Sequence, residues 1–236
     1  MRTLPVAILA GGLATRLRPL TDSVPKALVA VKGEPFIHHQ LRLLKKNGVD
    51  EVVLCVGHLG ELIRDAVGDG ADWGLKVSYS FDGATLLGTG GALMKALPRL
   101  GDCFFVLYGD SYLPVDFRAV QAAFDPRNAD ALMTVLSNGN RWDRSNVRFE
   151  NGLLVEYDKR SARPEMRHID YGLGIIGASV FGAYASEKAF DLADYYRDLS
   201  LRGRLAGFEV ATRFYEIGSV KGIEDTEAFL SNKGGS

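Results

Sequence analysis

The chain has 236 residues, of which 47% are hydrophobic, so it is long and apolar enough to form one α/β domain with a substantial core. Its 28 Lys and Arg residues nearly balance 29 Asp and Glu residues, which gives no reason to expect nucleic acid or an anionic membrane as a partner. No apolar stretch approaches the ~18 residues of a membrane span, and a strand-like run near the N-terminus leaves no room for a signal peptide. Because Cys55 and Cys103 also lie in apolar runs typical of buried free thiols, we expect a cytoplasmic protein.

Strands and helices alternate through the first half of the chain. Apolar strand-like runs are separated by segments with helical spacing of apolar residues, and Asn47-Gly48 is a helix stop signal. We expect strands at 6–10, 51–56, 75–80 and 104–107, and helices at 36–46, 59–67 and 88–98. This alternation predicts a parallel, doubly wound α/β sheet, in which ligands bind outside the carboxyl ends of the strands. Gly11 and Asp110 both fall at such ends.

The second half is richer in strands. We expect strands at 132–136, 147–149, 153–157, 171–181 and 209–217, helices at 186–201 and 220–230, and a disordered tail at 233–236. Glu150-Asn151-Gly152 is a hairpin signal. Since no Pro/Ser-rich linker divides the chain, residues 1–232 are expected to form a single domain whose halves meet near residue 130.

Residues 6–28 contain a strand, a glycine turn and a group of cations. Gly11 and Gly12 leave room for backbone N–H groups to approach phosphates, and Arg16, Arg18 and Lys26 add positive charge at the same strand end. A Gly-Gly turn after a strand is by itself common in α/β proteins, and this one is neither a P-loop nor the three-glycine dinucleotide motif. The combination indicates a nucleoside triphosphate site.

The run Gly11-Gly12-Leu13-Ala14-Thr15-Arg16-Leu17-Arg18-Pro19-Leu20-Thr21, with Pro25-Lys26 after it, resembles the signature of the sugar-1-phosphate nucleotidylyltransferases. That family usually has Gly in place of Ala14 and a second Pro in place of Ala27. The resemblance implies a Rossmann-like, doubly wound mixed sheet of the GT-A type. It also implies catalytic roles for Arg16 and Lys26, and nucleotide binding by Ala10, Gly11, Gly12 and Thr15.

Two further motifs imply a magnesium site. Tyr108-Gly109-Asp110 resembles the family's G-D at the end of a central strand, where the Asp is catalytic and binds Mg²⁺. Phe214-Tyr215-Glu216-Ile217-Gly218-Ser219 resembles the family's W-x-D-I-G-T, with Glu216 where Asp is usual. Carboxylate oxygens suit a hard cation, so the resemblance implies Mg²⁺ on Asp110 and Glu216. An ordinary Asp at a strand-to-loop turn is the alternative for Asp110 taken alone.

Gly88-Thr89-Gly90-Gly91-Ala92 resembles the family's L-G-T-G/A-G-A, which packs against the base and ribose. The alternative is a simple glycine turn that begins a helix. The resemblance implies that the nucleotide also contacts Gly88, Thr89, Gly90 and Gly109, with Asp82 as a weaker candidate near the base.

The acceptor side is less strongly marked. Val155-Glu156-Tyr157-Asp158-Lys159 resembles the family's V-x-x-F-x-E-K, whose Lys pairs with the acceptor phosphate. Asp170 and Gly172 stand where relatives have N-x-G, and an Asp accepts sugar hydrogen bonds but does not donate them. Arg144, in a polar loop with Arg141 and Asn146, is a further candidate, although the composition of this segment favours a solvated loop.

The four motifs, from Gly11 to Gly218, cover nearly the whole chain. They imply transfer of a nucleotidyl group from a nucleoside triphosphate to a sugar 1-phosphate, with a nucleotide-binding half at about 1–130 and a sugar-phosphate-binding half at about 131–232. The chain looks most like bacterial guanylyltransferases that use GTP and D-glycero-α-D-manno-heptose 1-phosphate in capsule, S-layer or lipopolysaccharide assembly. Uridylyl-, thymidylyl- or cytidylyltransferases acting on another sugar 1-phosphate or phosphocholine share most of these residues. The resemblance also implies a homodimer or homotetramer.

Two other classes of protein remain as alternatives. Some relatives are regulatory subunits that bind nucleotide sugars without making them, and such chains typically lose the signature Arg, Lys or metal carboxylate. A metal-dependent glycosyltransferase would be expected to show Asp-x-Asp at the strand end, whereas this chain has Asp110-Ser111-Tyr112.

Overall fold

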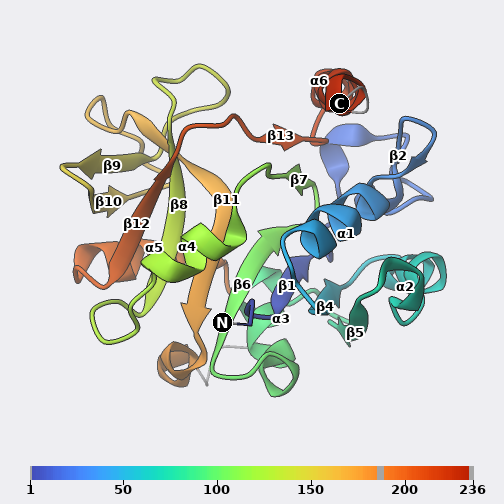
Figure 1. Ribbon diagram of the computed structural model, residues 1–236, viewed down its shortest axis with the longest axis horizontal. Coiled ribbons are helices and arrows are strands. Elements are labelled where there is room, and N and C mark those ends of the chain that lie inside the picture. Colours follow the sequence, from blue (N-terminus) through green and yellow to red (C-terminus); the bar gives the residue numbers. More distant parts are fainter. Residues whose placement is uncertain (1, 185–188, 234–236) are drawn as a thin grey trace.

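A nine-stranded mixed sheet forms the centre of the molecule (Figure 1). The computed structural model describes residues 2–184 and 189–233. Seven strands follow the order β10-β9-β11-β6-β1-β4-β5, and β8 and β12 extend the sheet from β11. The expected doubly wound mixed sheet is confirmed.

Four parallel strands and the helices between them make the first half. The strands are β1 (Val6–Leu9), β4 (Glu51–Val56), β5 (Lys76–Phe81) and β6 (Cys103–Tyr108). Residues alternate along β1, so that Val6 and Ile8 pack on one face and Ala7 on the other.

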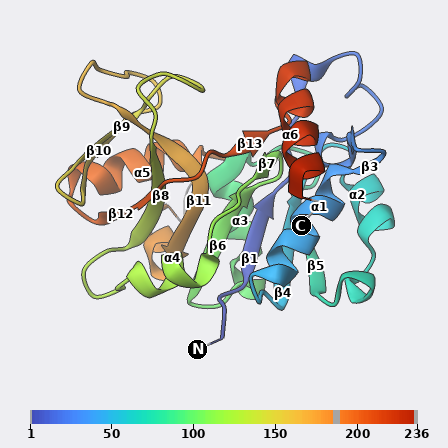
Figure 2. The same ribbon diagram turned by 45° about the horizontal axis from the view of Figure 1, so that its top comes forward.

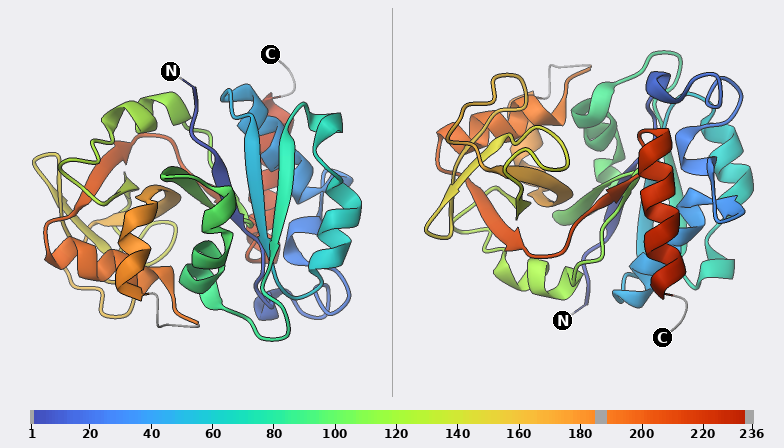
Figure 3. Two further views of the ribbon diagram at one scale, coloured as in Figure 1. Left: turned by 90° about the horizontal axis from the view of Figure 1, so that it is seen from below. Right: turned by 90° about the horizontal axis from the view of Figure 1, so that it is seen from above.

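The first face is covered by α1 (Phe36–Lys46), α2 (Gly60–Val67) and α4 (Phe117–Ala123). The second face is covered by α3 (Gly88–Ala96) and α5 (Leu192–Leu201). Figure 3 (left) shows α1 and α2 on one side of β4 and β5 and α3 on the other. Helices on both faces bury both sides of the parallel strands.

The second half adds antiparallel strands to the edge of β6. β11 (His168–Gly177) pairs with β6 and with β8 (Ala131–Ser137), and β12 (Leu205–Val210) runs parallel to β8. β9 (Val147–Glu150) and β10 (Leu153–Tyr157) form the expected hairpin. Its turn residues Asn151 and Gly152 have φ of 52° and 78°, as a type I′ turn requires.

The C-terminal part departs from the sequence-based expectation. The single strand expected at 209–217 is wrong: β12 ends at Val210, and a separate short strand, β13 (Tyr215–Glu216), pairs with β7 (Ser111–Tyr112). Figure 2 shows β13 crossing from β12 toward α6 (Val220–Lys233). The apolar pattern runs through both strands, but they pair with different partners in different halves of the molecule.

The boundaries of two other elements also differ from the sequence-based expectation. β11 ends at Gly177 instead of residue 181, because a 3-10 turn, Ala178–Tyr184, follows it. The helix expected at 186–201 begins as α5 at Leu192, after Asp191, whose carboxylate accepts the N–H of Ala193 and caps it. Residues 186–188 of that expectation, and 234–236 of the expected tail, lie outside the described residues.

Several short elements were not expected. They are α4, the hairpin β2 (Ala30–Val31) and β3 (Glu34–Pro35), and 3-10 turns at Thr15–Leu17, Lys26–Leu28, Ala71–Trp73 and Leu97–Arg99. The strand β2 packs with α6, which covers this side of the molecule.

Most of the buried apolar residues of the core lie on the strands of the sheet and on the helices that cover it. In the part of the chain that the structure describes, no helix is long and apolar enough to cross a membrane. Cys55 is buried and unpaired, as expected, whereas the unpaired Cys103 is only partly buried.

Candidate active site

The glycine loop after β1 lies against two neighbouring strands. A Cβ added to Gly11 would lie 3.1 Å from the backbone nitrogen of Gly57 and 3.4 Å from a carboxylate oxygen of Asp82. Ala14 has φ of 50°, which costs a residue with a Cβ roughly 1–2 kcal/mol and explains why the resembling signature has Gly at this place. The Thr21 hydroxyl donates to the carbonyl of Ala14 at 2.8 Å and holds this turn.

A cavity of about 250 Å³, the glycine-loop cavity, opens at the carboxyl ends of β1 and β6. Most of the predicted nucleotide-binding residues line it, namely Ala10, Gly11, Gly12, Asp82, Gly88, Thr89 and Gly109. Lys26 and Asp110 line it as well. The sequence reasoning missed its apolar part, Leu9, Cys55, Leu86 and Ala92. Apolar walls with a few polar groups are typical of small-molecule sites.

Two predicted nucleotide-binding residues, Thr15 and Gly90, lie outside the lining of this cavity. Gly90 lies against Phe190, whose ring carbon would be 2.1 Å from an added Cβ. Beside it, Thr89 donates to the carboxylate of Asp191 at 2.9 Å and accepts the N–H of Leu192 at 2.8 Å. The start of α3 is thus fastened to the start of α5.

Asp82 presents a partly buried carboxylate to the same cavity. Its Oδ2 accepts the N–H of Leu87 at 3.2 Å, and burial raises the pKa of the carboxyl group above its usual value. A carboxylate with spare acceptor capacity in an apolar wall favours a ligand that brings N–H donors.

Asp110 and Lys26 meet where the glycine-loop cavity ends. The Lys26 ammonium donates to Oδ2 of Asp110 at 2.8 Å, and both side chains are largely buried. The turn that carries Asp110 is held from behind by Gln40 of α1, a buried residue that the sequence reasoning did not single out. The Gln40 amide donates to the carbonyls of Tyr108 and Ser111 at 2.9 and 2.8 Å.

Glu216 reaches Asp110 through strand pairing. Glu216 is opposite Ser111 in the β13–β7 pair, and the N–H of Ile217 donates to the carbonyl of Asp110 at 3.0 Å. Burial raises the pKa of Glu216 above its usual value, and the negative charge of Asp110 adds to the increase, while Arg16 and Lys26 oppose it.

The donor set at this place suits a cation held only partly by protein. Within residues 2–184 and 189–233, no cluster of three or more His, Cys, Asp or Glu side chains forms a complete metal site. Two neighbouring carboxylates that repel each other fit Mg²⁺, which commonly takes one or two carboxylates together with substrate phosphates.

A second cavity of about 350 Å³, the Lys159 cavity, adjoins the first. All four residues predicted for the sugar phosphate line it, namely Arg144, Lys159, Asp170 and Gly172, and so do Arg16 and Glu216. Tyr108 and Asp110 belong to both cavities. The sequence reasoning missed Asp143 and Tyr157, and favoured a solvated loop where Asn146 and Arg144 now line the cavity.

Asp170 is held rigidly in the Lys159 cavity. Its Oδ1 accepts the N–H of Gly172 at 2.9 Å, and its own N–H donates to the side-chain oxygen of Asn146 at 2.9 Å. Burial raises the pKa of Asp170 to about 6, although the Gly172 N–H and the Lys159 charge partly oppose this.

The three cations of the first motif have different places. Lys26 lines the glycine-loop cavity beside Asp110, and Arg16, an exposed residue, lines the Lys159 cavity near Glu216 and Gly218. Arg18 forms an exposed ion pair with Asp22 at 3.2 Å.

Comparison with known proteins agrees with this geometry. A family model described as nucleotidyl transferase matches residues 6–146. The chain is 32% identical over 228 residues to an N-acetylmuramate alpha-1-phosphate uridylyltransferase of Neisseria meningitidis, covering 94% of this chain and 96% of that protein. It is 28% identical over 230 residues to a D-glycero-alpha-D-manno-heptose 1-phosphate guanylyltransferase of Campylobacter jejuni, covering 95% and 98%.

A solved structure supports the fold. The inositol-1-phosphate CTP transferase from T. maritima superposes with a TM-score of 0.79, at 21% identity, over 98% of this chain and 96% of that one.

Proposed function

Because the chain belongs to the nucleotidyl transferase family and is a sugar-1-phosphate nucleotidylyltransferase, we propose that it joins GTP and D-glycero-α-D-manno-heptose 1-phosphate. The observation that carries this proposal is the pair of adjoining cavities that share Tyr108 and Asp110. The glycine-loop cavity takes the nucleoside triphosphate, and the Lys159 cavity takes the sugar phosphate. The reacting phosphorus then lies at their junction.

In the proposed reaction, an oxygen of the sugar phosphate forms a bond to the α-phosphorus, and the bond to the β-phosphate oxygen breaks. The products are a nucleoside diphosphate sugar and pyrophosphate. The nucleophile is already an anion, so the residues mainly position groups and neutralise charge. Lys26 neutralises the α-phosphate, Arg16 neutralises the departing pyrophosphate, and Lys159 holds the incoming phosphate.

We propose that Asp110 and Glu216 hold Mg²⁺. A bound magnesium ion supplies positive charge to the triphosphate and polarises its phosphoryl oxygens. The Lys26 ammonium, which donates to Oδ2 of Asp110 at 2.8 Å, holds that carboxylate toward the junction.

Asp82 supports guanine as the base. The Watson–Crick edge of guanine carries two adjacent N–H donors, N1–H and N2–H, which match one carboxylate. Uracil and thymine offer a single imino N–H on that edge. Among the described residues, the Asp82 carboxylate accepts a hydrogen bond from the Leu87 N–H alone, so it has capacity for both guanine donors.

The charges of the Lys159 cavity support a neutral, polyhydroxylated sugar. Four carboxylates line this cavity, those of Asp110, Asp143, Asp170 and Glu216, together with the three cations Arg16, Arg144 and Lys159. The carboxylates accept hydrogen bonds from sugar hydroxyls, and their excess over the cations opposes a ligand that brings a carboxylate in addition to its phosphate. N-acetylmuramate 1-phosphate carries an extra carboxylate. UTP with that sugar is the second candidate, because the 32% identical relative from Neisseria meningitidis is named for it.

Pyrophosphate release tests the proposal directly. GTP, UTP, CTP, dTTP and ATP are crossed with heptose, mannose, glucose and N-acetylmuramate 1-phosphates in the presence of Mg²⁺. We expect one dominant signal, from GTP with the heptose phosphate. A dominant UTP and N-acetylmuramate signal would instead establish the second candidate, and silence across the panel with ligand-induced thermal stabilisation would indicate a binding-only protein.

Two variants test the assigned roles in the same assay. Lys26→Ala and Asp110→Asn should each lower kcat by about 10²–10³-fold, because each removes a charge positioned at the reacting phosphate. Lys76→Ala is the matched control, since Lys76 is an exposed residue whose nearest carboxylate partner is 3.9 Å away at Glu51. Wild-type turnover in either site variant would contradict the mechanism.

A further inference from the structure

One wall of the Lys159 cavity is a loop, residues 138–146, that is strongly hydrogen-bonded within itself. The buried side chain of Asn138 donates to the carbonyl of Asp143 and to the hydroxyl of Ser145, and it accepts the N–H of Trp142. Asn140 and Ser145 exchange two more hydrogen bonds, at 3.0 and 2.8 Å. The 138–146 loop therefore moves as one body, and it carries Asp143 and Arg144 into the cavity.

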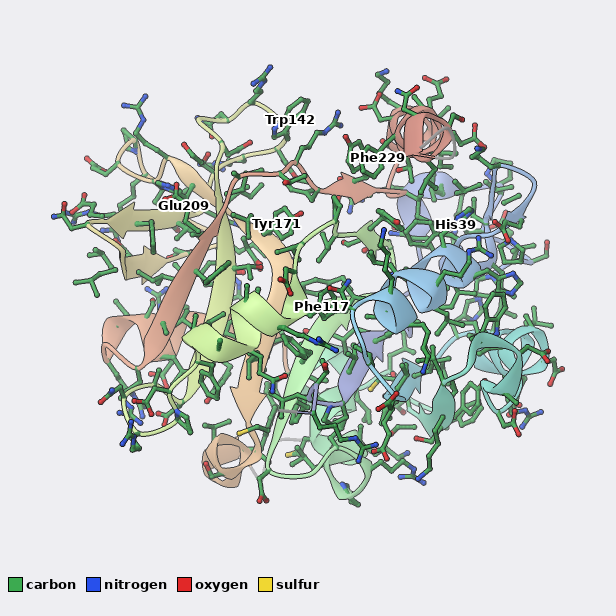
Figure 4. The ribbon with its side chains drawn as sticks, viewed as in Figure 1. His39, Phe117, Trp142, Tyr171, Glu209 and Phe229 are labelled. Carbon is green, nitrogen blue, oxygen red and sulfur yellow. The ribbon has the colours of Figure 1, made fainter. Side chains whose placement is uncertain are left out.

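The outer side of this loop is held by an arginine from the segment between β12 and β13. The Arg213 guanidinium lies over the Trp142 ring, 3.8 Å from the ring centre, and Arg141 lies 4.8 Å from the same ring centre. Figure 4 shows Trp142 at the side of the molecule where β13 runs toward α6. A guanidinium stacked on an indole is the favoured form of a cation–π contact.

Arg213 is in turn fixed to the C-terminal elements. It donates to the carboxylate of Asp225 in α6 at 2.7 Å, and it lies 4.9 Å from the Tyr215 ring. Tyr215 itself stacks on Phe229 of α6 at 4.1 Å between ring centres. Within the described residues, the Arg213 Nε is buried without a hydrogen-bond partner, so the two rings and Asp225 define its position.

We propose that Arg213 is a positioning residue that sets the affinity for the sugar phosphate by holding Trp142. The stack joins the 138–146 loop to the segment that carries Glu216, so that both walls of the Lys159 cavity keep their spacing. Arg213 itself is outside the lining of that cavity. The inference rests on the proposed function in one respect, namely that the Lys159 cavity binds the sugar phosphate.

The size of the effect follows from the strength of such contacts. Cation–π contacts change an equilibrium by roughly 2- to 30-fold, depending on how far they are removed from water. Losing the stack frees the loop, and Asp143 and Arg144 must then be ordered again when the sugar phosphate binds. The cost appears in the KM for the sugar phosphate and leaves the glycine-loop cavity untouched.

The kinetic test compares Arg213→Ala, Arg213→Lys and a matched control, Arg204→Ala. Arg204 also forms an ion pair with a carboxylate, Asp130, but lines neither cavity. We expect Arg213→Ala to raise the KM for the sugar phosphate about tenfold, with the KM for the nucleoside triphosphate unchanged. Arg213→Lys should recover part of the loss, because an ammonium also binds the face of an indole. Equal KM changes for both substrates, or none for the sugar phosphate, would overturn the proposal.

A fluorescence measurement keeps the proposal testable without any substrate. The chain has two tryptophans, so Trp73→Phe leaves Trp142 as the single reporter. In that background, Arg213→Ala should make Trp142 more accessible to acrylamide, whereas Arg204→Ala should not. If the wild-type enzyme is inactive with GTP and the heptose phosphate, the proposed substrates are wrong. If acrylamide quenching is unchanged in Arg213→Ala, the stack on Trp142 is not what restrains the loop.

Discussion

At the scale of single residues, the buried carboxylate of Asp170 lowers the stability of the folded protein at neutral pH. Its carboxylate accepts the N–H of Gly172 and lies in a cavity with other acidic groups. Burial raises its pKa to about 6. At neutral pH the carboxyl group is therefore ionised, although its surroundings in the folded protein disfavour the charge. The Lys159 cavity therefore keeps this carboxylate at a cost in stability.

Asp170→Asn is therefore expected to stabilise the fold above pH 6. Asn keeps the acceptor oxygen for Gly172 and removes the buried charge. The pKa of the wild-type group is higher in the folded state than in the unfolded state, so the advantage of the variant is absent below about pH 4, grows up to about pH 6 and then stays constant. Thermal melts of the variant and the wild type from pH 3.5 to 8 measure this difference in stability. Each kcal/mol of added stability raises Tm by roughly 2–4 °C. A variant with unchanged or lower Tm at pH 8 would contradict the raised pKa.

At the scale of secondary-structure elements, α1 holds the turn that carries Asp110. Gln40 projects from α1 and gives both amide hydrogens to carbonyls on either side of Gly109 and Asp110. Gln40 is therefore positioned to set the direction of the Asp110 carboxylate.

Gln40→Met tests this support, because it keeps the side-chain length and removes both donors. We expect kcat to fall about tenfold for one or two lost buried hydrogen bonds of about 1 kcal/mol each, and the Mg²⁺ concentration for half-maximal activity to rise. Gln121→Met is the matched control, since Gln121 also bridges backbone groups, at Arg2 and Leu4, but lines neither cavity. Equal loss of stability in both variants with unchanged Mg²⁺ dependence would make Gln40 a structural residue only.

At the scale of the whole molecule, the two halves are joined at several places around the junction of the cavities. β11 continues the sheet from β6, and β13 returns to pair with β7. On the opposite face, Phe190 and Asp191 of the second half hold the start of α3 through Gly90 and Thr89. Both cavities therefore lie in one continuous body, while the homodimer or homotetramer and the cytoplasmic location stay predictions.

Gly90→Ala tests the joint between the halves. Its Cβ would lie 2.1 Å from the Phe190 ring, so overpacking should destabilise the protein by about 1–3 kcal/mol. Because Gly88 and Thr89 line the glycine-loop cavity, the KM for the nucleoside triphosphate should rise as well. Gly182→Ala is the control, as no atom of the residues that the structure describes lies within 4 Å of its added Cβ. Urea unfolding measures the stability, and initial rates measure the KM for the nucleoside triphosphate. If Gly90→Ala has wild-type values of both quantities, the contact between Gly90 and Phe190 is dispensable.

The amino-acid sequence by itself, through its motifs and apolar runs, determined the family, the mixed sheet and about half of the residues that line the two cavities. The strands follow from local information, because apolar runs predict strands, and glycines and charges directly after a strand lie at its carboxyl end. For this reason Gly11 and Asp110 could be placed at a common site before any coordinates were known. The mixed sheet and the places of Lys159 and Asp170 were implied by the resemblance to the family. Their individual functions stay predictions.

Only the tertiary structure decided which distant segments meet. The resemblance implied that Glu216 lies beside Asp110, but only the structure shows that the pairing of β13 with β7 brings them together, because the apolar pattern predicted one strand through residues 209–217. The same is true of Gln40 under the Asp110 turn, of Gly90 against Phe190 and of Arg213 on Trp142. Local periodicity carries no information on such contacts, because they depend on strand register and on packing between residues far apart in the chain.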